Sequence, residues 1–165
     1  MIKEITKLIP EKTLMTFAIR YLAFTKIPLA FYVRPSVTDI SNTGVKIKIP
    51  FKRRNKNHIG SMYFGAMTIG AEVAAGIIAM NLIRESKQKI SLIFKHFTGD
   101  FLKRAEGDTF FICEDGESIG NLVRATIESG EREEIEVAVR ATVPSKLGNE
   151  PIARFSFTLS LKMRG

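Results

Sequence analysis

The sequence predicts an α+β fold in which an antiparallel sheet wraps around one long apolar helix. Residues 62–83 are nearly all apolar and rich in Ala and Gly, which is typical of a helix that other elements surround on all sides. Several other segments alternate apolar with polar residues, which predicts strands with one buried face. A sheet built from these strands has to curl around the helix to bury it.

The chain length of 165 residues fits one domain with a substantial core. We therefore expect a single domain over residues 1–165. Within it we expect an N-terminal helical extension at residues 1–28 and the central helix at residues 60–84.

The first elements are a helix and a hairpin. Apolar residues recur at helical spacing over residues 11–26, which predicts an amphipathic helix that caps an edge or end of the sheet. Residues 31–41 and 44–52 are rich in β-formers and flank a turn at residues 42–44, which predicts a hairpin. Pro35 lies inside the first of these runs and favours an edge strand or a bulge there.

The second half of the chain predicts further strands and one short helix. The helix is expected at residues 118–130, where four apolar residues recur with helical spacing. The strands are expected at residues 89–97, 107–117, 132–143 and 151–163.

Composition restricts the compartment and the chemistry. Cys113 is the only cysteine, so no intramolecular disulfide can form, and Cys/His spacings typical of a metal site are absent. The N-terminal residues lack the pattern of a secretory signal, so we expect a cytoplasmic protein without a metal or cofactor. Glu72 interrupts the long apolar stretch, which argues against a membrane span. The net charge of +8 favours anionic partners such as the phosphates of coenzyme A, a membrane surface or nucleic acid.

A glycine-containing turn leads into the central helix and is a candidate oxyanion site. Asn57, Gly60, Ser61 and Gly65 place small residues and free backbone N–H groups at the start of this helix. The partial positive charge of a helix N-terminus suits an anion or a polarised carbonyl oxygen. The alternative is structural: the glycines allow tight packing and Asn57 caps a turn.

Glu72 is the second feature, because a carboxylate on an apolar helix is costly unless it has a partner or lines a cleft. A buried carboxylate paired with a backbone group or a cation is the structural alternative. Gly65 and Glu72 lie two helical turns apart, about 10 Å along the axis. One helix therefore cannot bring both to the same carbonyl, and we expect a site shared between two-fold-related subunits.

These residues resemble a known family. The order Asn57, Gly60, then Tyr63–Phe64–Gly65 and an acid at Glu72 is similar to that of hotdog-fold thioesterases of the phenylacetate-degradation type, and of related hotdog proteins with an NHxGSM-like signature. Tyr63 stands where the family usually has His, Phe64 where it has Gly, and Glu72 where Asp is commoner.

The resemblance implies a hotdog fold and hydrolysis of acyl-CoA or of an acyl-carrier thioester by a homodimer or dimer of dimers. By this resemblance Glu72 is the nucleophile or general base, the Gly65 N–H polarises the carbonyl, and Asn57 orients substrate or water. The residues expected to contact substrate around the turn are His58, Gly60, Ser61, Tyr63 and Phe64.

Two other functions remain open at this stage. The first is a hotdog protein that binds an acyl group without hydrolysing it. The second is a hydroxyacyl dehydratase, since His58 precedes Glu72 by fourteen residues, the spacing of the His/acid pair in dehydratases of this fold.

Other polar residues are interpreted more simply. Phe51 is the only aromatic residue in the basic run from Lys46 to His58, which favours phosphate contacts over nucleic-acid binding. His96 alternates with Ile90, Leu92 and Phe94 and is expected to face the core or a pocket rim, and Cys113 is expected to be an apolar strand residue. The possible contacts for the phosphates of coenzyme A are Lys52, Arg53, Arg54 and Lys56.

Overall fold

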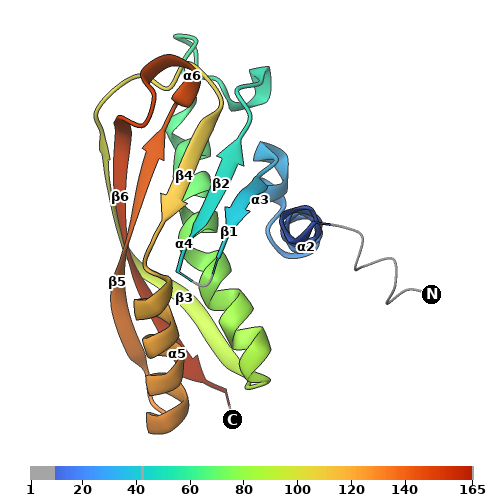
Figure 1. Ribbon diagram of the computed structural model, residues 1–165, viewed down its shortest axis with the longest axis vertical. Coiled ribbons are helices and arrows are strands. Elements are labelled where there is room, and N and C mark those ends of the chain that lie inside the picture. Colours follow the sequence, from blue (N-terminus) through green and yellow to red (C-terminus); the bar gives the residue numbers. More distant parts are fainter. Residues whose placement is uncertain (1–9, 42, 165) are drawn as a thin grey trace, which may run out of the picture.

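The computed structural model describes residues 10–41 and 43–164; residues 1–9 of the predicted extension, and Asn42 of the predicted turn, lie outside the described residues. Six antiparallel strands form one sheet in the order β1-β2-β4-β5-β6-β3, and the sheet curls around a long helix, α4 (Figure 1). The predicted α+β architecture is therefore confirmed. The strands are β1 (Ser36–Ile40), β2 (Val45–Ile49), β3 (Ile90–Phe101), β4 (Thr109–Cys113), β5 (Glu133–Thr142) and β6 (Pro151–Met163).

Helix α4 (Phe64–Ser86) is the predicted central helix, and the residues preceding Phe64 form a turn instead of its first helical turn. It packs against strands β2 to β6 and against helices α3 and α5. Gly70 allows the closest approach, because a Cβ at this position would lie 2.4 Å from the ring of Phe111. The helix is long and apolar enough to cross a membrane, but 56% of the apolar window is buried in the protein, as in the core helix of a globular domain.

Helix α2 (Glu11–Lys26) matches the predicted amphipathic helix and lies beside the edge strand β1 (Figure 1). Its buried residues Met15, Ile19 and Ala23 are four residues apart and so share one side of the helix. The hydroxyl oxygen of Thr16 accepts a hydrogen bond from the N–H of Val37 at 2.9 Å. Helix α2 therefore covers the outer edge of β1, as expected from the sequence.

The predicted strand over residues 31–41 is wrong at its beginning. Residues 31–33 complete a short helix, α3 (Pro28–Val33), and β1 starts only at Ser36. Pro28 occupies the first turn of α3, where its missing N–H and fixed φ favour helix formation. Arg34 then ends the helix with φ 58°, and the helix terminates directly before Pro35. As predicted from Pro35, β1 is an edge strand and contains an irregularity between Val37 and Asp39.

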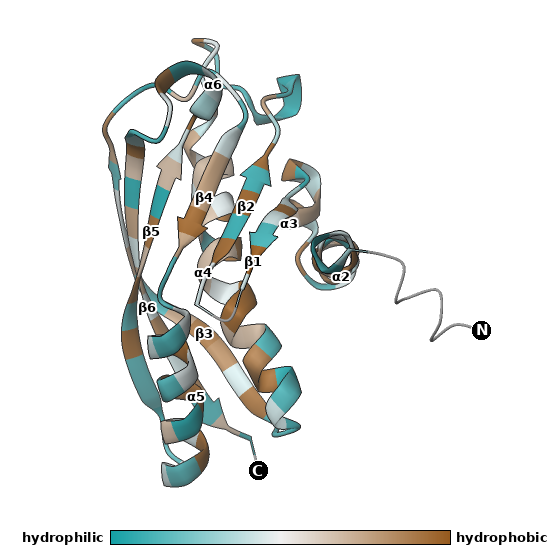
Figure 2. Ribbon diagram, in the orientation of Figure 1, coloured by the Kyte–Doolittle hydropathy of each residue, from teal (hydrophilic) through white to brown (hydrophobic). Residues whose placement is uncertain are grey.

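Strand β2 follows its predicted alternation: Val45, Ile47 and Ile49 are buried and Lys46 and Lys48 are partly exposed (Figure 2). The buried face of β2 packs on α4, so the alternation places one side of the strand in the core.

Strand β3 differs from its prediction in length and in the direction of one side chain. It continues past residue 97 to Phe101, because β6 supplies partners along its whole length. A bulge between Phe94 and His96 interrupts the alternation, so that Phe94 pairs with Leu159 and His96 with Thr158. His96 is consequently exposed and does not line the adjacent cavity, so the prediction that it faces the core or a pocket rim is wrong.

The remaining elements cover the ends of the sheet. Helix α5 (Gly116–Ser129) matches the short helix predicted at residues 118–130 and packs on α4, β5 and β6. Cys113 is buried at the end of β4, and burial raises the pKa of its thiol to about 11. This agrees with its expected role as an apolar strand residue. Two short helical segments complete the fold: η1 (Arg53–Asn55) and α6 (Pro144–Leu147).

Candidate active site

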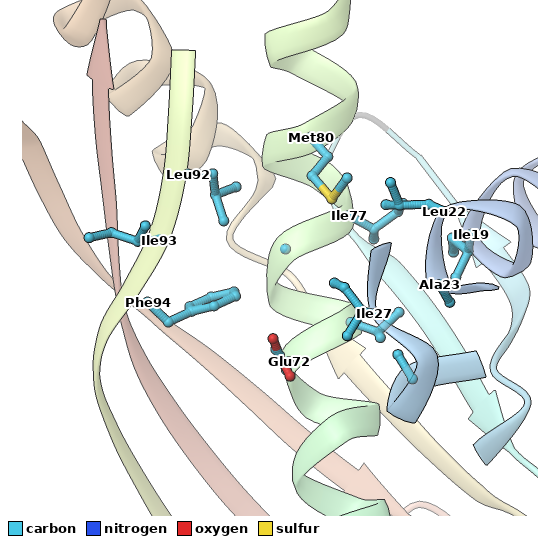
Figure 3. Close-up of a pocket in the computed structure, with 13 residues that line it drawn as sticks. Ile19, Leu22, Ala23, Ile27, Glu72, Ile77, Met80, Leu92, Ile93 and Phe94 are labelled. Carbon is cyan, nitrogen blue, oxygen red and sulfur yellow. The ribbon is translucent and has the colours of Figure 1, made fainter. Parts of the chain in front are cut away.

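An apolar cavity of about 420 Å³ lies between α2, α3, α4 and β3 (Figure 3). Its size is within the range of small-ligand sites, roughly 300–1,000 Å³. Every side chain that lines it is hydrocarbon or thioether except the carboxylate of Glu72. The lining residues are Ile19, Leu22, Ala23, Ile27, Ala30, Glu72, Val73, Gly76, Ile77, Met80, Leu92, Ile93 and Phe94.

Glu72 projects from α4 into the space between Ile27 and Phe94 (Figure 3). The carboxylate is partly buried, and desolvation raises its pKa above the ordinary value. Among residues 10–41 and 43–164, no group donates a hydrogen bond to this carboxylate or forms an ion pair with it. The sequence prediction of a lone acid that lines a cleft therefore agrees with the structure, whereas the alternative of a paired buried acid does not.

The turn before α4 is held by its own hydrogen bonds. The side-chain Oδ1 of Asn57 accepts the N–H groups of Ile59 and Ser61 at 3.1 and 3.0 Å. The backbone N–H of Asn57 donates to the carbonyl of Ser61 at 2.8 Å, and Gly60 takes a φ of 79° that favours glycine. The Ser61 hydroxyl donates to the carbonyl of Ala105 at 3.3 Å. Asn57 thus caps the turn through its oxygen, and among the described residues its Nδ2 has no hydrogen-bond acceptor.

The first turn of α4 presents free backbone donors. Tyr63 precedes the helix without capping it through its side chain, and the first intrahelical bond runs from the N–H of Met67 to the carbonyl of Tyr63. Within the described chain, the N–H groups of Phe64, Gly65 and Ala66 have no acceptor. A Cβ on Gly65 would lie 2.6 Å from the Tyr63 ring, so this glycine keeps the ring close to the backbone.

The predicted site residues fall into two groups. Glu72 lines the cavity, while Asn57, Gly60, Ser61 and Gly65 belong to the turn and do not line it. The two groups are about 10 Å apart along α4, so one subunit does not bring Gly65 and Glu72 together. The other predicted contacts, His58, Tyr63 and Phe64, are exposed around the turn and are also absent from the cavity lining.

The four residues predicted to contact phosphate also fall into two groups. Lys52, Arg53 and Arg54 line an open hollow beside α3. Lys56 does not line it; its Nζ lies 4.1 Å from the centroid of the Phe51 ring. The hollow shares no residue with the Glu72 cavity.

Asn55 is a buried residue that the sequence interpretation did not identify. Its Nδ2 donates to the carbonyls of Val33 and Pro50 at 3.1 and 2.9 Å, and its carbonyl accepts the N–H of Tyr63 at 2.7 Å. It therefore ties the ends of α3 and β2 to the start of α4. An asparagine in a basic loop is a common surface residue, so the sequence carried no signal of this burial.

The chain belongs to the family described as DUF4442, a domain of unknown function, whose model matches residues 16–161. No curated protein matches the chain closely enough to be named as a relative.

Solved structures share the fold. A probable thioesterase of unknown function from Pseudomonas aeruginosa is 26% identical and superposes with a TM-score of 0.71 over 90% of this chain and 96% of that one. A thioesterase family protein from Silicibacter pomeroyi (18% identity, TM-score 0.64) covers 90% and 99% of the two chains, and a thioesterase from Haemophilus influenzae (10%, 0.63) covers 87% of each. These similarities confirm the hotdog fold and the resemblance to hotdog thioesterases that was inferred from the sequence, whereas the NHxGSM-like signature stays a prediction.

Proposed function

We propose that this protein hydrolyses acyl thioesters such as acyl-CoA, with the acyl group in the Glu72 cavity. The observation that carries the proposal is a lone carboxylate with a raised pKa in a cavity that is otherwise apolar. Such a cavity favours a hydrocarbon ligand and excludes the cations that would pair with the acid. The thioesterase names of several structural neighbours support the same reaction class.

The proposed chemistry needs one base and one oxyanion site. Glu72 removes a proton from water as the water oxygen attacks the thioester carbonyl, and the proton passes to the thiolate when the C–S bond breaks. Direct attack by the carboxylate would give an anhydride that water then opens, with the same acid and thiol as products. The N–H of Gly65 stabilises the oxyanion, and Asn57 orients substrate or water with its Nδ2 while its Oδ1 holds the turn.

A second copy of the chain would complete this site, because Gly65 and Glu72 of one copy are too far apart. Strand β3 offers the surface for it: β6 is its single partner in the sheet, so its outer edge has unpaired backbone groups. Ile93, Phe97 and Phe101 on this strand are 45%, 39% and 47% exposed, and Ile93 also lines the cavity. We propose a homodimer, alone or within a tetramer, in which β3 pairs with its copy next to the two cavities.

A thiol-release assay with short, medium, long and aryl acyl-CoAs tests the reaction. We expect hydrolysis of at least one of them, and a fall in kcat of about 10²- to 10⁴-fold in Glu72→Gln, because the amide cannot accept the proton. Glu85→Gln, at an exposed position of the same helix, is the matched control and should keep full activity. Hydrolysis that survives Glu72→Gln would refute the assignment, and acyl-CoA binding without any turnover would favour the non-catalytic alternative.

Mixing two inactive variants tests the shared site. If Glu72 of one copy works with Gly65 of the other, a heterodimer of Glu72→Gln and Gly65→Val chains contains one intact site and one doubly altered site. Random exchange of equal amounts should then restore about a quarter of the wild-type activity. No recovery, with exchange of subunits verified, would place the whole site within one copy.

The basic residues before the turn remain proposed contacts for the phosphates of coenzyme A. Lys52, Arg53, Arg54 and Lys56 precede the turn directly in sequence, and the first three share the basic hollow. If they contact coenzyme A, their replacement should raise KM while kcat changes little.

A further inference from the structure

Helices α2 and α3 carry a row of apolar side chains that face away from the protein. On α2, Leu14, Phe17, Tyr21 and Phe24 follow each other at helical spacing on the side opposite the buried row of Met15, Ile19 and Ala23. Their exposed fractions are 44%, 64%, 73% and 64%, and Leu29 and Tyr32 of α3 are 65% and 54% exposed. We call these six residues the outer face. An exposed apolar row of this extent is typical of a surface that binds a partner.

The net positive charge of the molecule comes from the part of the sequence that carries this face. Residues 10–58 contain ten of the 25 lysines and arginines but only two of the 17 acids, Glu11 and Asp39, so they account for the whole net charge of +8. The outer face adjoins the basic hollow through Tyr32, which lines that hollow and lies 5.8 Å from the Arg54 guanidinium. The hollow is lined by Arg20, Tyr32, Arg34, Pro50, Lys52, Arg53 and Arg54. In the described part of the chain none of these cations pairs with an acid.

The combination of charge and apolar surface indicates which kind of partner the outer face binds. A second copy docked on the outer face by two-fold symmetry would bring two strongly basic surfaces together, and like charges facing each other are unfavourable. The edge strand β3 is the better surface for a copy of this chain, because its two charged residues, Lys95 and Asp100, are of opposite sign. An apolar helical row beside clustered Lys and Arg is instead the pattern of a helix that lies in a membrane interface. Tyr21 and Tyr32 suit that location, because their rings are apolar and their hydroxyls polar.

We propose that the outer face binds the surface of a bilayer that contains anionic phospholipids. Phe17, Tyr21, Phe24 and Leu29 enter the boundary of the acyl chains, and the arginines and lysines of the hollow contact the lipid phosphates. The opposite side of α2 supplies Ile19, Leu22 and Ala23 to the Glu72 cavity. One helix therefore has lipid on one side and the cavity on the other.

Vesicle flotation tests the proposal. The vesicles consist of phosphatidylcholine alone or with roughly a third phosphatidylglycerol, and no acyl-CoA is present because the same cations are proposed contacts for coenzyme A. We expect the wild type to float with the anionic vesicles and at least tenfold less with the neutral ones. Raising NaCl from about 0.1 M to about 1 M should release it, because the Debye length falls from about 10 Å to about 3 Å.

Two pairs of substitutions assign the binding to the outer face and to the hollow. Phe17→Ser with Phe24→Ser, and separately Arg53→Glu with Arg54→Glu, should each lower binding at least tenfold with an unchanged circular dichroism spectrum. All four side chains are exposed, so the fold should tolerate the changes. The matched controls are Leu102→Ser with Ile127→Ser and Lys87→Glu with Lys89→Glu, which change exposed residues away from α2, α3 and the hollow.

Three outcomes would overturn the proposal. The first is wild-type protein that does not float with anionic vesicles, which would leave an acidic protein as the partner. The second is binding that the control pairs reduce as much as the test pairs. The third is an oligomer that Phe17→Ser with Phe24→Ser dissociates in sedimentation, which would assign the outer face to a second copy. Thioester hydrolysis enters none of these measurements, so they are independent of the proposed enzyme function.

Discussion

The proposed site has two parts, the turn before α4 and the Glu72 cavity, and their polar side chains differ in hydrogen bonding. Around the start of α4, Asn55 and Asn57 each make two side-chain hydrogen bonds to backbone groups. Further along the same helix, Glu72 faces an apolar cavity and has a raised pKa. These hydrogen bonds stabilise the fold, although the Oδ1 of Asn55 is buried without a partner among the described residues. A desolvated carboxylate destabilises the fold. Under the proposed function, this difference makes the turn end mainly a scaffold, held by Asn55 and the Oδ1 of Asn57, and makes Glu72 the reacting carboxylate.

The largest expected effect is at the scaffold end. Asn55→Ala removes both Nδ2 donors from the buried side chain, so the carbonyls of Val33 and Pro50 lose a partner in the core. We expect the free energy of unfolding to fall by about 2–3 kcal/mol. The Val33 carbonyl is left unsatisfied at a cost of about 1–3 kcal/mol, while the Pro50 carbonyl keeps the N–H of Lys52 as a donor and loses one of two bonds, at about 1 kcal/mol. Chemical denaturation measures this loss. An unchanged denaturation midpoint would show that Asn55 does not hold the three elements together.

A smaller effect is expected at Asn57, where two variants separate its two proposed roles. Asn57→Ala removes the oxygen that accepts the N–H groups of Ile59 and Ser61, and should cost about 1–2 kcal/mol. Asn57→Asp keeps an acceptor oxygen but lacks the Nδ2 donor, so it should keep most of the stability.

The kcat of Asn57→Asp then measures how much the contact of Nδ2 with substrate or water contributes to catalysis. We expect a fall in kcat of about tenfold, well below that of Glu72→Gln. If Asn57→Asp were as inactive as Glu72→Gln and as stable as the wild type, the scaffold interpretation of the turn end would fail.

The smallest effect is a gain in stability from Glu72→Gln that depends on pH. Because burial raises the pKa of Glu72 in the folded protein, the ionised form is disfavoured there relative to the unfolded chain. The unfolded-state pKa is about 4.3, so below it both states are protonated and the variant and wild type should be equally stable. As the pH rises from that value through the folded-state pKa, the wild type loses stability and the glutamine variant does not. Thermal unfolding between pH 4 and pH 8 measures the difference.

The outcome that would contradict this prediction is a wild type that is more stable than Glu72→Gln at neutral pH. It would mean that the carboxylate is stabilised by a partner, and that Glu72 resembles the asparagines of the turn end. Asp108→Asn is a suitable control. This acid is only partly buried, accepts the N–H of Phe51 at 2.8 Å and lies 3.5 Å from Lys48, so its change should not produce a gain at neutral pH.

The sequence alone predicted the elements whose residues follow a local period. The alternation of β2, the all-apolar character of α4 and the helical spacing of α2 are properties of consecutive residues, so they identified the α+β class and the lone acid. The turn chemistry at Asn57 was also readable from the sequence, since an asparagine that accepts N–H groups two and four residues later needs no distant partner.

The tertiary structure decided what depends on residues far apart in the chain. The bulge that turns His96 outward arises in the pairing of β3 with β6, and the burial of Asn55 arises where α3 meets the start of α4. Apart from residues of α4 itself, the apolar surroundings of Glu72 come from α2, α3 and β3, whose residues lie about 20 to 50 positions from it in sequence. A periodic pattern shows which side of an element is buried, but only packing shows which other element covers it.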